Sequence, residues 1–186
     1  IGCGMLTTQI PTDVGIIDLK KLDEVIRNIV PAGRNVRDEI INFEELEELY
    51  CFHQLKNIEW IRRSLGTLGG GNHFIEVDTD SKGTSYLVIH TGSRNLGKQV
   101  AEIYQKIAIE DTQGTDGLET EIQKLVKEYK RSGRHRDIQN GIDELKRKWN
   151  PNKLGIPKEL CYLTGEHRKQ YLHDMKICQE FARINR

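Results

Sequence analysis

The chain has 186 residues, of which 37% are hydrophobic and 30% are charged, a composition typical of a soluble globular protein with extensive helical surface. This length suits one domain with a substantial core and is marginal for two. Lysine and arginine number 28, as do aspartate and glutamate, so the net charge does not indicate a polyanionic partner. No run approaches the roughly 20 apolar residues of a membrane span, and there is no signal-peptide pattern, so we expect no membrane association.

The four cysteines are widely spaced and form no Cys-x-x-Cys pair, which argues against a zinc ribbon and against a disulfide scaffold. They are Cys3, Cys51, Cys161 and Cys178. Reduced thiols of this kind are typical of a cytoplasmic protein. The chain begins at Ile1 without a methionine, and its first four residues resemble the middle of a motif, so we expect a fragment of a longer polypeptide.

The first third of the chain predicts an extended segment followed by two helices. Residues 5–17 contain Pro11 and Gly15 and predict an extended segment with a turn. Asp18 is a suitable N-cap for a helix over 19–29, whose apolar residues keep helical spacing, and residues 31–33 end it. We expect a second helix over about 43–64, with an apolar stripe that begins at Phe43.

The centre of the chain predicts a glycine-rich loop and a β-hairpin. The loop covers residues 66–71, and the two strands cover 73–77 and 85–90, with a turn between them. Because side chains alternate along a strand, Phe74 and Glu76 should share one face, and His73 should point to the other with Ile75 and Val77. On the second strand, the same rule places Val88 and His90 on one face with Tyr86.

The remainder predicts helices around 100–107, 118–129, 137–149 and 166–185, the third of which should stop at Pro151. A basic run over 127–136 could bind phosphates, although a solvated helix face is the more ordinary interpretation. The whole pattern predicts an α+β fold, in which a sheet element that carries the chemically interesting residues is flanked by several helices.

Three groups of residues could carry chemistry: Cys3 between two glycines, Asn72-His73 after a triple glycine, and His90 before a Ser93-Arg94 pair. His73 and His90 lie at the mouths of paired strands and could converge on one metal ion, or they could be unrelated histidines with local hydrogen bonds. The glycines could form an anion nest or a simple turn. Arg94 could bind a phosphate at a helix N-terminus or form a surface ion pair.

Three blocks of the sequence, taken together, resemble the RtcB family of RNA ligases. The blocks are Ile1-Gly2-Cys3-Gly4-Met5, residues 66–77 from Gly66 to Val77, and residues 88–94 from Val88 to Arg94. Residues 171–186 resemble the helix of that family that follows the hairpin region, so the resemblance spans the chain. It is most specific over residues 66–94, and it leads us to expect one partial RtcB-type domain over residues 1–186.

The resemblance implies an enzyme that joins RNA ends with a 2′,3′-cyclic phosphate or 3′-phosphate to 5′-hydroxyl ends, using GTP and Mn²⁺. It implies that Cys3, His73 and His90 are metal ligands, for manganese or adventitiously for Zn²⁺. Asn72 would bind the guanylate α-phosphate, while Phe74 and Glu76 would contact the guanine. Arg94 would hold an RNA or nucleotide phosphate. The implied partners are RNA and a guanine nucleotide.

The family's guanylylated histidine and its Cys-His-His-Asn metal block have no counterpart in this sequence, nor does the aspartate before Ile1. The histidines after residue 94 are His135, His167 and His173, and none lies in a comparable segment. We therefore predict no catalytic nucleophile here and an isolated chain that is inactive. The alternatives are a non-catalytic module that binds metal and guanine nucleotide, a metal-dependent hydrolase without an evident carboxylate base, and a poorly folding fragment.

Overall fold

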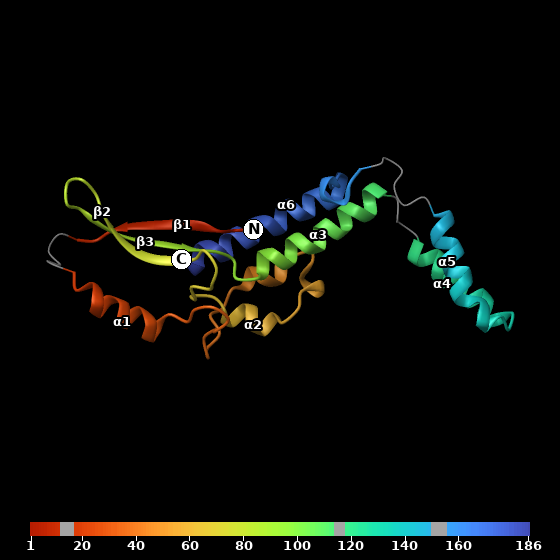
Figure 1. Ribbon diagram of the computed structural model, residues 1–186, viewed down its shortest axis with the longest axis horizontal. Helices are drawn as coiled ribbons and strands as arrows, with labels where there is room; N and C mark the ends of the chain where they lie inside the picture. Colours follow the sequence, from red (N-terminus) through yellow and green to blue (C-terminus); the bar gives the residue numbers. More distant parts are fainter. Residues whose placement is uncertain (12–16, 114–117, 150–155) are drawn as a thin grey trace. The chain divides into compact units, whose positions relative to one another are not determined.

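The computed structural model describes residues 1–11, 17–113, 118–149 and 156–186, and it confirms the predicted α+β fold (Figure 1). The strands are β1 (Gly4–Gln9), β2 (Phe74–Thr79) and β3 (Ser85–Thr91). The α-helices are α1 (Leu19–Ile29), α2 (Ile58–Arg63), α3 (Leu96–Gln113), α4 (Leu118–Arg131), α5 (Ile138–Lys148) and α6 (Gly165–Asn185). Short 3₁₀ helices are η2 (Glu44–Glu48), η3 (Phe52–Gln54), η4 (His135–Asp137) and η5 (Lys158–Leu160).

The chain forms two compact units. The first contains residues 1–101 together with 170–186, and the second contains residues 102–169. The three strands, α1 and α2 belong to the first unit, and α4 and α5 belong to the second. The expectation of a single partial domain over residues 1–186 stays a prediction, because two compact units can belong to one domain.

The sheet has the strand order β1-β3-β2, and both pairs are antiparallel (Figure 1). The hairpin of β2 and β3 confirms the prediction, and β1 pairs with the other edge of β3. In this register Phe74 and Met5 both lie opposite His90, so these three residues share one face at one end of the sheet. The register confirms that Phe74 and Glu76 share one face and that Val88 and His90 share one, and because Glu76 lies opposite Val88, it shows that the two groups are on the same face.

Three predicted helices are confirmed at their boundaries. α1 begins after Asp18, whose carboxylate accepts a hydrogen bond from the backbone N–H of Lys21 at 3.0 Å. α5 ends at Lys148, while Pro151 lies outside the described residues, as does the turn predicted around Gly15. α6 ends at Asn185, as expected, and no helix among the described residues is both long and apolar enough to cross a membrane.

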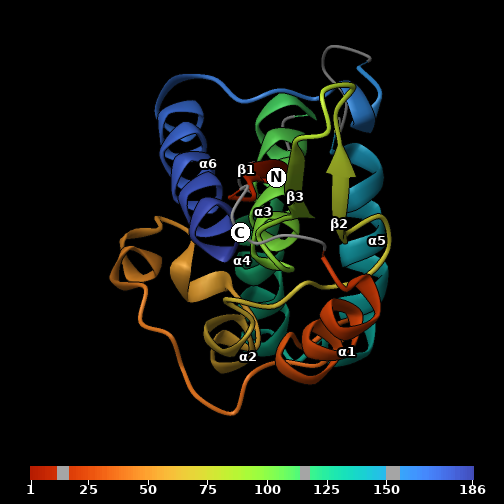
Figure 2. The same ribbon diagram turned by 90° about the vertical axis from the view of Figure 1, so that its left-hand side faces the viewer.

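The predicted helix over 43–64 is wrong. The structure contains η2, η3 and α2 in this region, which Figure 2 shows as separate short turns. The buried carboxylate of Asp174 accepts the backbone N–H groups of Tyr50 at 3.0 Å and Cys51 at 3.1 Å, which removes those donors from a helical ladder. Asn57 then adopts a left-handed conformation, with φ of 55°, so the chain turns before α2 begins.

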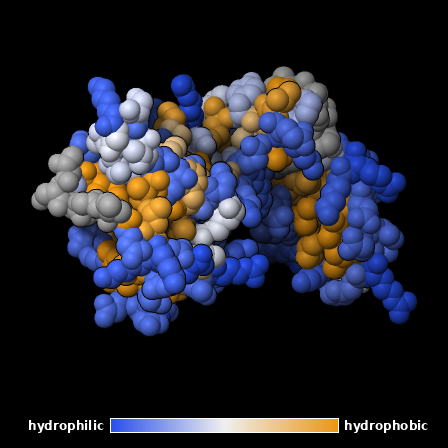
Figure 3. Space-filling view, turned by 60° about the vertical axis from the view of Figure 1, so that its left-hand side comes forward, coloured by the Kyte–Doolittle hydropathy of each residue, from blue (hydrophilic) through white to orange (hydrophobic). Residues whose placement is uncertain are grey.

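The core of the first unit forms where these short helices meet α6. Leu46, Ile61 and Leu65 are almost completely buried, and the rings of Phe43 and Phe181 pack edge to face at 5.3 Å. Apolar side chains of α1 and β1 remain exposed nearby, among them Leu19 and Met5. Figure 3 shows hydrophobic residues at the surface among hydrophilic ones. Buried residues of η2, α2 and α6 therefore contribute to the core of the first unit.

Candidate metal and nucleotide site

Cys3, His73 and His90 lie together at one end of the sheet, and their potential ligand atoms are all within 4.8 Å of one another. Cys3 Sγ lies 3.8 Å from His73 Nε2, and the two imidazole ring centres are 5.6 Å apart. The three residues come from three separate segments: Cys3 lies directly before β1, His73 directly before β2 and His90 near the end of β3. The structure therefore brings together the residues that the sequence suggested as one ligand set.

Cys3 owes its position to close backbone packing around the first residues. Gly2 has a φ of +92°, and a Cβ there would lie 2.8 Å from the carbonyl oxygen of Cys178. A Cβ on Gly92 would lie 2.8 Å from Cys3 Sγ, so this thiol sits directly over a glycine of the β3–α3 connection. Ser93 Oγ donates to the carbonyl oxygen of Ile1 at 2.5 Å and accepts the N–H of Gly97 at 3.0 Å. This pair of bonds ties the N-terminal residues to the start of α3.

His73 is held in one tautomer by the backbone. Its Nδ1 lies 2.9 Å from the carbonyl oxygen of Leu68, which can only accept, so Nδ1 carries the hydrogen and Nε2 presents a lone pair toward Cys3. Strict alternation would place His73 on the face opposite Phe74 and His90. His73 precedes β2, however, so its direction is set by the Leu68 hydrogen bond instead of by the pleat. Burial lowers the pKa of His73, which favours the neutral form.

His90 occupies the end of β3, where the ring of Phe74 stacks on its imidazole at 5.4 Å between centroids. Its Nε2 is buried and has no hydrogen-bond partner in the part of the chain that the structure describes. An unsatisfied buried imidazole nitrogen is costly, and a metal ion bound at that nitrogen would satisfy it. The unsatisfied Nε2 of His90 is therefore the observation that supports metal binding by this cluster.

The donor set is compatible with a transition-metal ion that retains an open position. One thiolate and two imidazoles suit Zn²⁺ well, and Mn²⁺ ordinarily prefers oxygen ligands. Ligands of a tetrahedral ion lie roughly 3.3–3.8 Å apart when their bonds are about 2.0–2.3 Å long. The 3.8 Å separation of Cys3 Sγ and His73 Nε2 already falls at this limit. Three protein ligands would leave a coordination position for a substrate oxygen.

The glycine-rich loop beside the cluster is a fixed structure. Gly69 has a φ of +85°, and a Cβ there would lie 1.8 Å from Arg94 Nη1 and 2.8 Å from His73 Nδ1. Its carbonyl oxygen accepts the N–H of Gly33 at 2.8 Å, and the carbonyl of Pro31 accepts the N–H of Leu68 at 2.9 Å. Glycine is therefore required at position 69 both for its conformation and for the space that it leaves.

Asn185, in the last turn of α6, was missed by the sequence analysis. Its Oδ1 accepts the N–H groups of Gly66 at 2.7 Å and Thr67 at 3.1 Å. Its Nδ2 donates to the carbonyl oxygens of Thr67 at 3.1 Å and Gly92 at 3.0 Å, and to Thr91 Oγ1 at 3.1 Å. The side chain thus joins the glycine-rich loop to the end of β3. A signal was present, because Asn185 lies four residues after Phe181 on the apolar face of the helix.

Arg94 is buried, with a φ of 48°, and its guanidinium stabilises the glycine-rich loop through hydrogen bonds. Its Nε donates to Thr67 Oγ1 at 2.9 Å, and its Nη2 donates to the carbonyl oxygen of Gly33 at 2.8 Å. The guanidinium carbon also lies 5.7 Å from the centre of the Trp60 ring. Of the two sequence interpretations, a surface ion pair is therefore wrong, and phosphate binding stays a prediction.

The residues predicted to bind nucleotide lie directly before β2 and on it, in the same segment as His73 of the candidate cluster. Asn72 and Glu76 are exposed, and Phe74 is half-buried against His90. The remaining late histidines serve other contacts: His167 Nδ1 lies 2.8 Å from Asp111, and His173 Nδ1 lies 3.1 Å from Asp174. Among the described residues, the one His/Cys/Asp/Glu cluster with metal-ligand spacing is that of Cys3, His73 and His90.

A sequence profile described as "tRNA-splicing ligase RtcB" matches residues 3–186, almost the whole chain. The chain belongs to the RtcB family. The RNA-splicing ligase RtcB of Escherichia coli strain K12 is 32% identical over 140 residues, a match that covers 64% of this chain and 34% of that RtcB protein. RtcB1 of a second Escherichia coli strain matches to the same extent.

Archaeal RtcB proteins match over a shorter stretch. The tRNA-splicing ligase RtcB of Pyrococcus horikoshii is 42% identical over 57 residues, covering 23% of this chain and 6% of that protein. The Aeropyrum pernix protein is 44% identical over 57 residues, covering 23% of this chain and 12% of that protein. The chain thus spans about a third of the length of the bacterial relatives that it matches, and no solved structure shows significant similarity to it.

Proposed function

We propose that this chain supplies metal and guanine-nucleotide residues to an RNA ligase, which joins 2′,3′-cyclic phosphate or 3′-phosphate RNA ends to 5′-hydroxyl ends with GTP and Mn²⁺. The observation that carries the proposal is the cluster of Cys3, His73 and His90 with its unsatisfied imidazole nitrogen, in a chain of the RtcB family. The relatives named RNA-splicing ligase RtcB support the RNA substrate.

Cys3, His73 and His90 would hold the metal ion, which when bound would stabilise negative charge on phosphate oxygens. The chain's own contribution is orientation. The Leu68 carbonyl keeps the lone pair of His73 Nε2 directed at Cys3, and the Phe74 ring supports the imidazole of His90. The low pKa of His73 keeps this ligand neutral and competent near neutral pH.

Asn72, Phe74 and Glu76 would bind the guanine nucleotide beside this cluster. The exposed Asn72 amide can donate to an α-phosphate oxygen, and the exposed Glu76 carboxylate can accept from the N–H edge of guanine. Phe74 links the two sites, since its ring stacks on His90 while it shares the strand face of Glu76. Arg94 would act mainly through the loop that it fixes, with a phosphate contact as its further proposed role.

A non-catalytic module that binds metal and guanine nucleotide is the second candidate function. This function is favoured because the histidines of α6 are not part of the candidate cluster. His167 contacts Asp111, and His173 contacts Asp174. We propose that the isolated chain therefore forms no covalent guanylate, whichever of the two functions it serves.

Calorimetric titration of the purified chain with Mn²⁺ and Zn²⁺ tests the proposal. Wild type should bind one of these ions, and Cys3→Ser or His90→Ala should weaken binding at least tenfold. Titration with GTP and ATP should then show a guanine preference that Glu76→Ala removes. Absence of metal binding in wild type, or equal binding of GTP and ATP unaffected by Glu76→Ala, would refute the assignment.

Incubation with radiolabelled GTP and Mn²⁺, followed by denaturing electrophoresis, tests whether the isolated chain contains a nucleophile for guanylylation. We expect no covalent label on this chain. A label that disappears in His135→Ala, His167→Ala or His173→Ala would show that the chain contains its own nucleophile. That result would overturn the expectation of an inactive isolated chain.

A further inference from the structure

The turn between α4 and α5 concentrates positive charge on an exposed surface. We use "basic turn" for residues 127–136, whose five cationic side chains are Lys127, Lys130, Arg131, Arg134 and Arg136. All five are exposed, whereas the same segment contains a single acidic residue, Glu128. The sequence analysis favoured a solvated helix face for this run, and Lys127, Lys130 and Arg131 do lie exposed at the end of α4, from which the run continues through a turn into η4.

The backbone of the basic turn is closed by hydrogen bonds at the end of α4. The N–H of Arg134 donates to the carbonyl of Tyr129 at 2.9 Å, and the N–H of Gly133 donates to the carbonyl of Lys130 at 3.3 Å. Gly133 has a φ of +73°, and nothing lies near a Cβ at that position. This pattern of two bonds around a left-handed glycine is a Schellman motif, which gives the turn one defined path.

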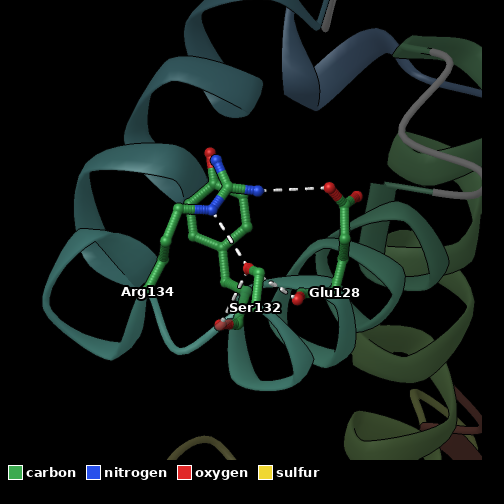
Figure 4. A network of polar contacts seen from close by, with 4 residues as sticks. Glu128, Ser132 and Arg134 are labelled. Carbon is green, nitrogen blue, oxygen red and sulfur yellow. Dashed lines mark hydrogen bonds and ion pairs between the residues drawn. The ribbon is translucent and has the colours of Figure 1, made fainter.

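The side chain of Arg134 folds back over the turn (Figure 4). Its guanidinium carbon lies 4.1 Å from the centre of the Tyr129 ring, and its Nε donates to Ser132 Oγ at 3.0 Å. Its Nη2 pairs with Glu128 at 3.2 Å. Arg134 thereby neutralises the one carboxylate of the basic turn and holds its shape.

The helical hairpin formed by α4 and α5 is closely packed. A Cβ on the buried Gly141 of α5 would lie 2.9 Å from the Tyr129 ring and 3.2 Å from Leu125 of α4. The ring that supports Arg134 is therefore itself supported by α5. Elsewhere in the hairpin, Lys124 and Lys148 pair with nearby glutamates of their own helices. By contrast, Lys127, Lys130, Arg131 and Arg136 make no ion pair with any residue that the structure describes.

We propose that the basic turn is an interaction surface for the phosphate backbone of RNA. Four unpaired cations on a preorganised turn can neutralise successive phosphates without reading the bases. The Tyr129 ring is covered on one face by the Arg134 guanidinium, so the exposed cations carry the proposed contact with phosphates. We infer RNA in preference to other polyanions because this inference rests on the proposed RNA ligase function. The surface is separate from Cys3, His73 and His90, which belong to the other compact unit.

The test uses the whole chain in EDTA without nucleotide, so it does not depend on the metal site. Fluorescence anisotropy with a labelled single-stranded RNA is recorded at several salt concentrations. The test variant carries Lys127→Gln, Lys130→Gln, Arg131→Gln and Arg136→Gln. The control carries Lys20→Gln, Lys21→Gln, Lys56→Gln and Lys82→Gln, four exposed lysines of the first unit, so both variants lose the same charge. Circular dichroism checks that both keep wild-type helicity.

We expect the test variant to lose at least tenfold in affinity, and the salt slope to fall by about 3, since each phosphate contact on a single strand contributes about 0.7. The control should change by less than about threefold. Equal losses in both variants would show a net-charge effect and overturn the inference, as would wild-type affinity in the test variant. A test variant that loses binding to polyglutamate but keeps RNA binding would also overturn it, in favour of an acidic protein partner.

The two proposals fail in different ways. If wild type binds metal and guanine nucleotide but the test variant binds RNA normally, the basic turn is excluded and the proposed function stands. If wild type binds neither metal nor nucleotide, yet the test variant still loses RNA affinity, the turn is an RNA surface and the candidate site is wrong. A wild-type chain that binds no RNA at any salt concentration would overturn the inference about the turn.

Discussion

Thr91 Oγ1 donates a 2.8 Å hydrogen bond to the carbonyl oxygen of Leu68, the same oxygen that accepts His73 Nδ1. The hydroxyl of Thr91 in turn accepts from Asn185 Nδ2 at 3.1 Å, so its hydrogen is committed to Leu68. One carbonyl therefore connects the orientation of His73, before β2, to the residue that follows His90 on β3. Contacts of this kind set the direction of metal-binding histidines.

We expect Thr91→Val to weaken metal binding, because valine keeps the shape of threonine but removes the hydroxyl that positions the Leu68 carbonyl. Supporting hydrogen bonds around a metal site are typically worth 10- to 100-fold in affinity, so the loss should be about tenfold or more. Titration with Zn²⁺ or Mn²⁺ measures it.

Thr91→Ser is the matched control, since it retains the donor and should keep affinity within about threefold of wild type. Thermal unfolding of the metal-free variants separates a general loss of stability from a loss at the site. Unchanged affinity in Thr91→Val would show that Leu68 holds His73 without help from Thr91.

Gly69→Ala should disrupt the glycine-rich loop, and Gly83→Ala provides a matched comparison. The two glycines have φ values of +85° and +84°, so both substitutions incur the left-handed strain of about 1–2 kcal/mol. Position 83 is open, whereas a Cβ at position 69 would collide with Arg94 Nη1 and His73 Nδ1. We therefore expect Gly69→Ala to be clearly more destabilising in urea titration and to reduce metal affinity, which Gly83→Ala should preserve. Equal destabilisation by the two would mean that the loop relaxes freely.

The cysteines should differ sharply in their reaction with iodoacetamide. Cys3 is exposed, whereas burial raises the pKa of the Cys178 thiol to about 12 and raises that of Cys51 further, with Asp174 adding to the effect at Cys51. Because the thiolate is the reactive form, mass spectrometry of the native chain at pH 8 should show alkylation at Cys3 well before Cys51 or Cys178.

Addition of the bound metal should slow the alkylation of Cys3, since a coordinated thiolate is protected. Guanidinium should make all four cysteines react at similar rates. Rapid labelling of Cys178 in the native chain would contradict its burial against the first residues, and labelling of Cys3 that ignores the metal would count against its role as a ligand.

The low pKa of His73 predicts a specific pH dependence of stability. An unfolded histidine titrates near 6.5, and burial keeps the folded residue neutral below that pH. As pH falls below about 6.5, the unfolded state takes up a proton first, so stability decreases until the folded pKa is reached and is constant below it. Above about 6.5 both states are neutral and His73 contributes no pH dependence.

Urea unfolding of the metal-free chain between pH 5 and 8 tests this, with His73→Gln as the comparison. Glutamine can donate to the Leu68 carbonyl but does not titrate in this range. The difference in free energy of unfolding between wild type and variant should shrink toward low pH. A difference that grows toward low pH would mean that folding raises the pKa of His73.

Local sequence determined those elements whose stabilising contacts are near in the chain. Asp18 caps α1 within one turn, and the alternation of the hairpin residues placed Phe74 with Glu76 and Val88 with His90. The family could also be recognised from the blocks around Cys3, Asn72-His73 and His90, because short motifs preserve residue types at fixed spacing. These features required no knowledge of distant contacts.

Tertiary structure decided what distant residues do to one another. Asp174 lies 123 residues after Cys51, and its carboxylate accepts the backbone N–H of Cys51. The segment 43–64, predicted to be one helix, therefore forms the short helices η2, η3 and α2. Asn185 joins the loop at Gly66 to the end of β3, and the hydrogen bond to the Leu68 carbonyl sets the direction of His73, which precedes β2. Each of these outcomes depends on buried polar groups finding hydrogen-bond partners far away in sequence, because leaving them unsatisfied would cost more than the local conformational preference. Residue types and spacing therefore identified the candidate ligands, and long-range hydrogen bonds determined how they face one another.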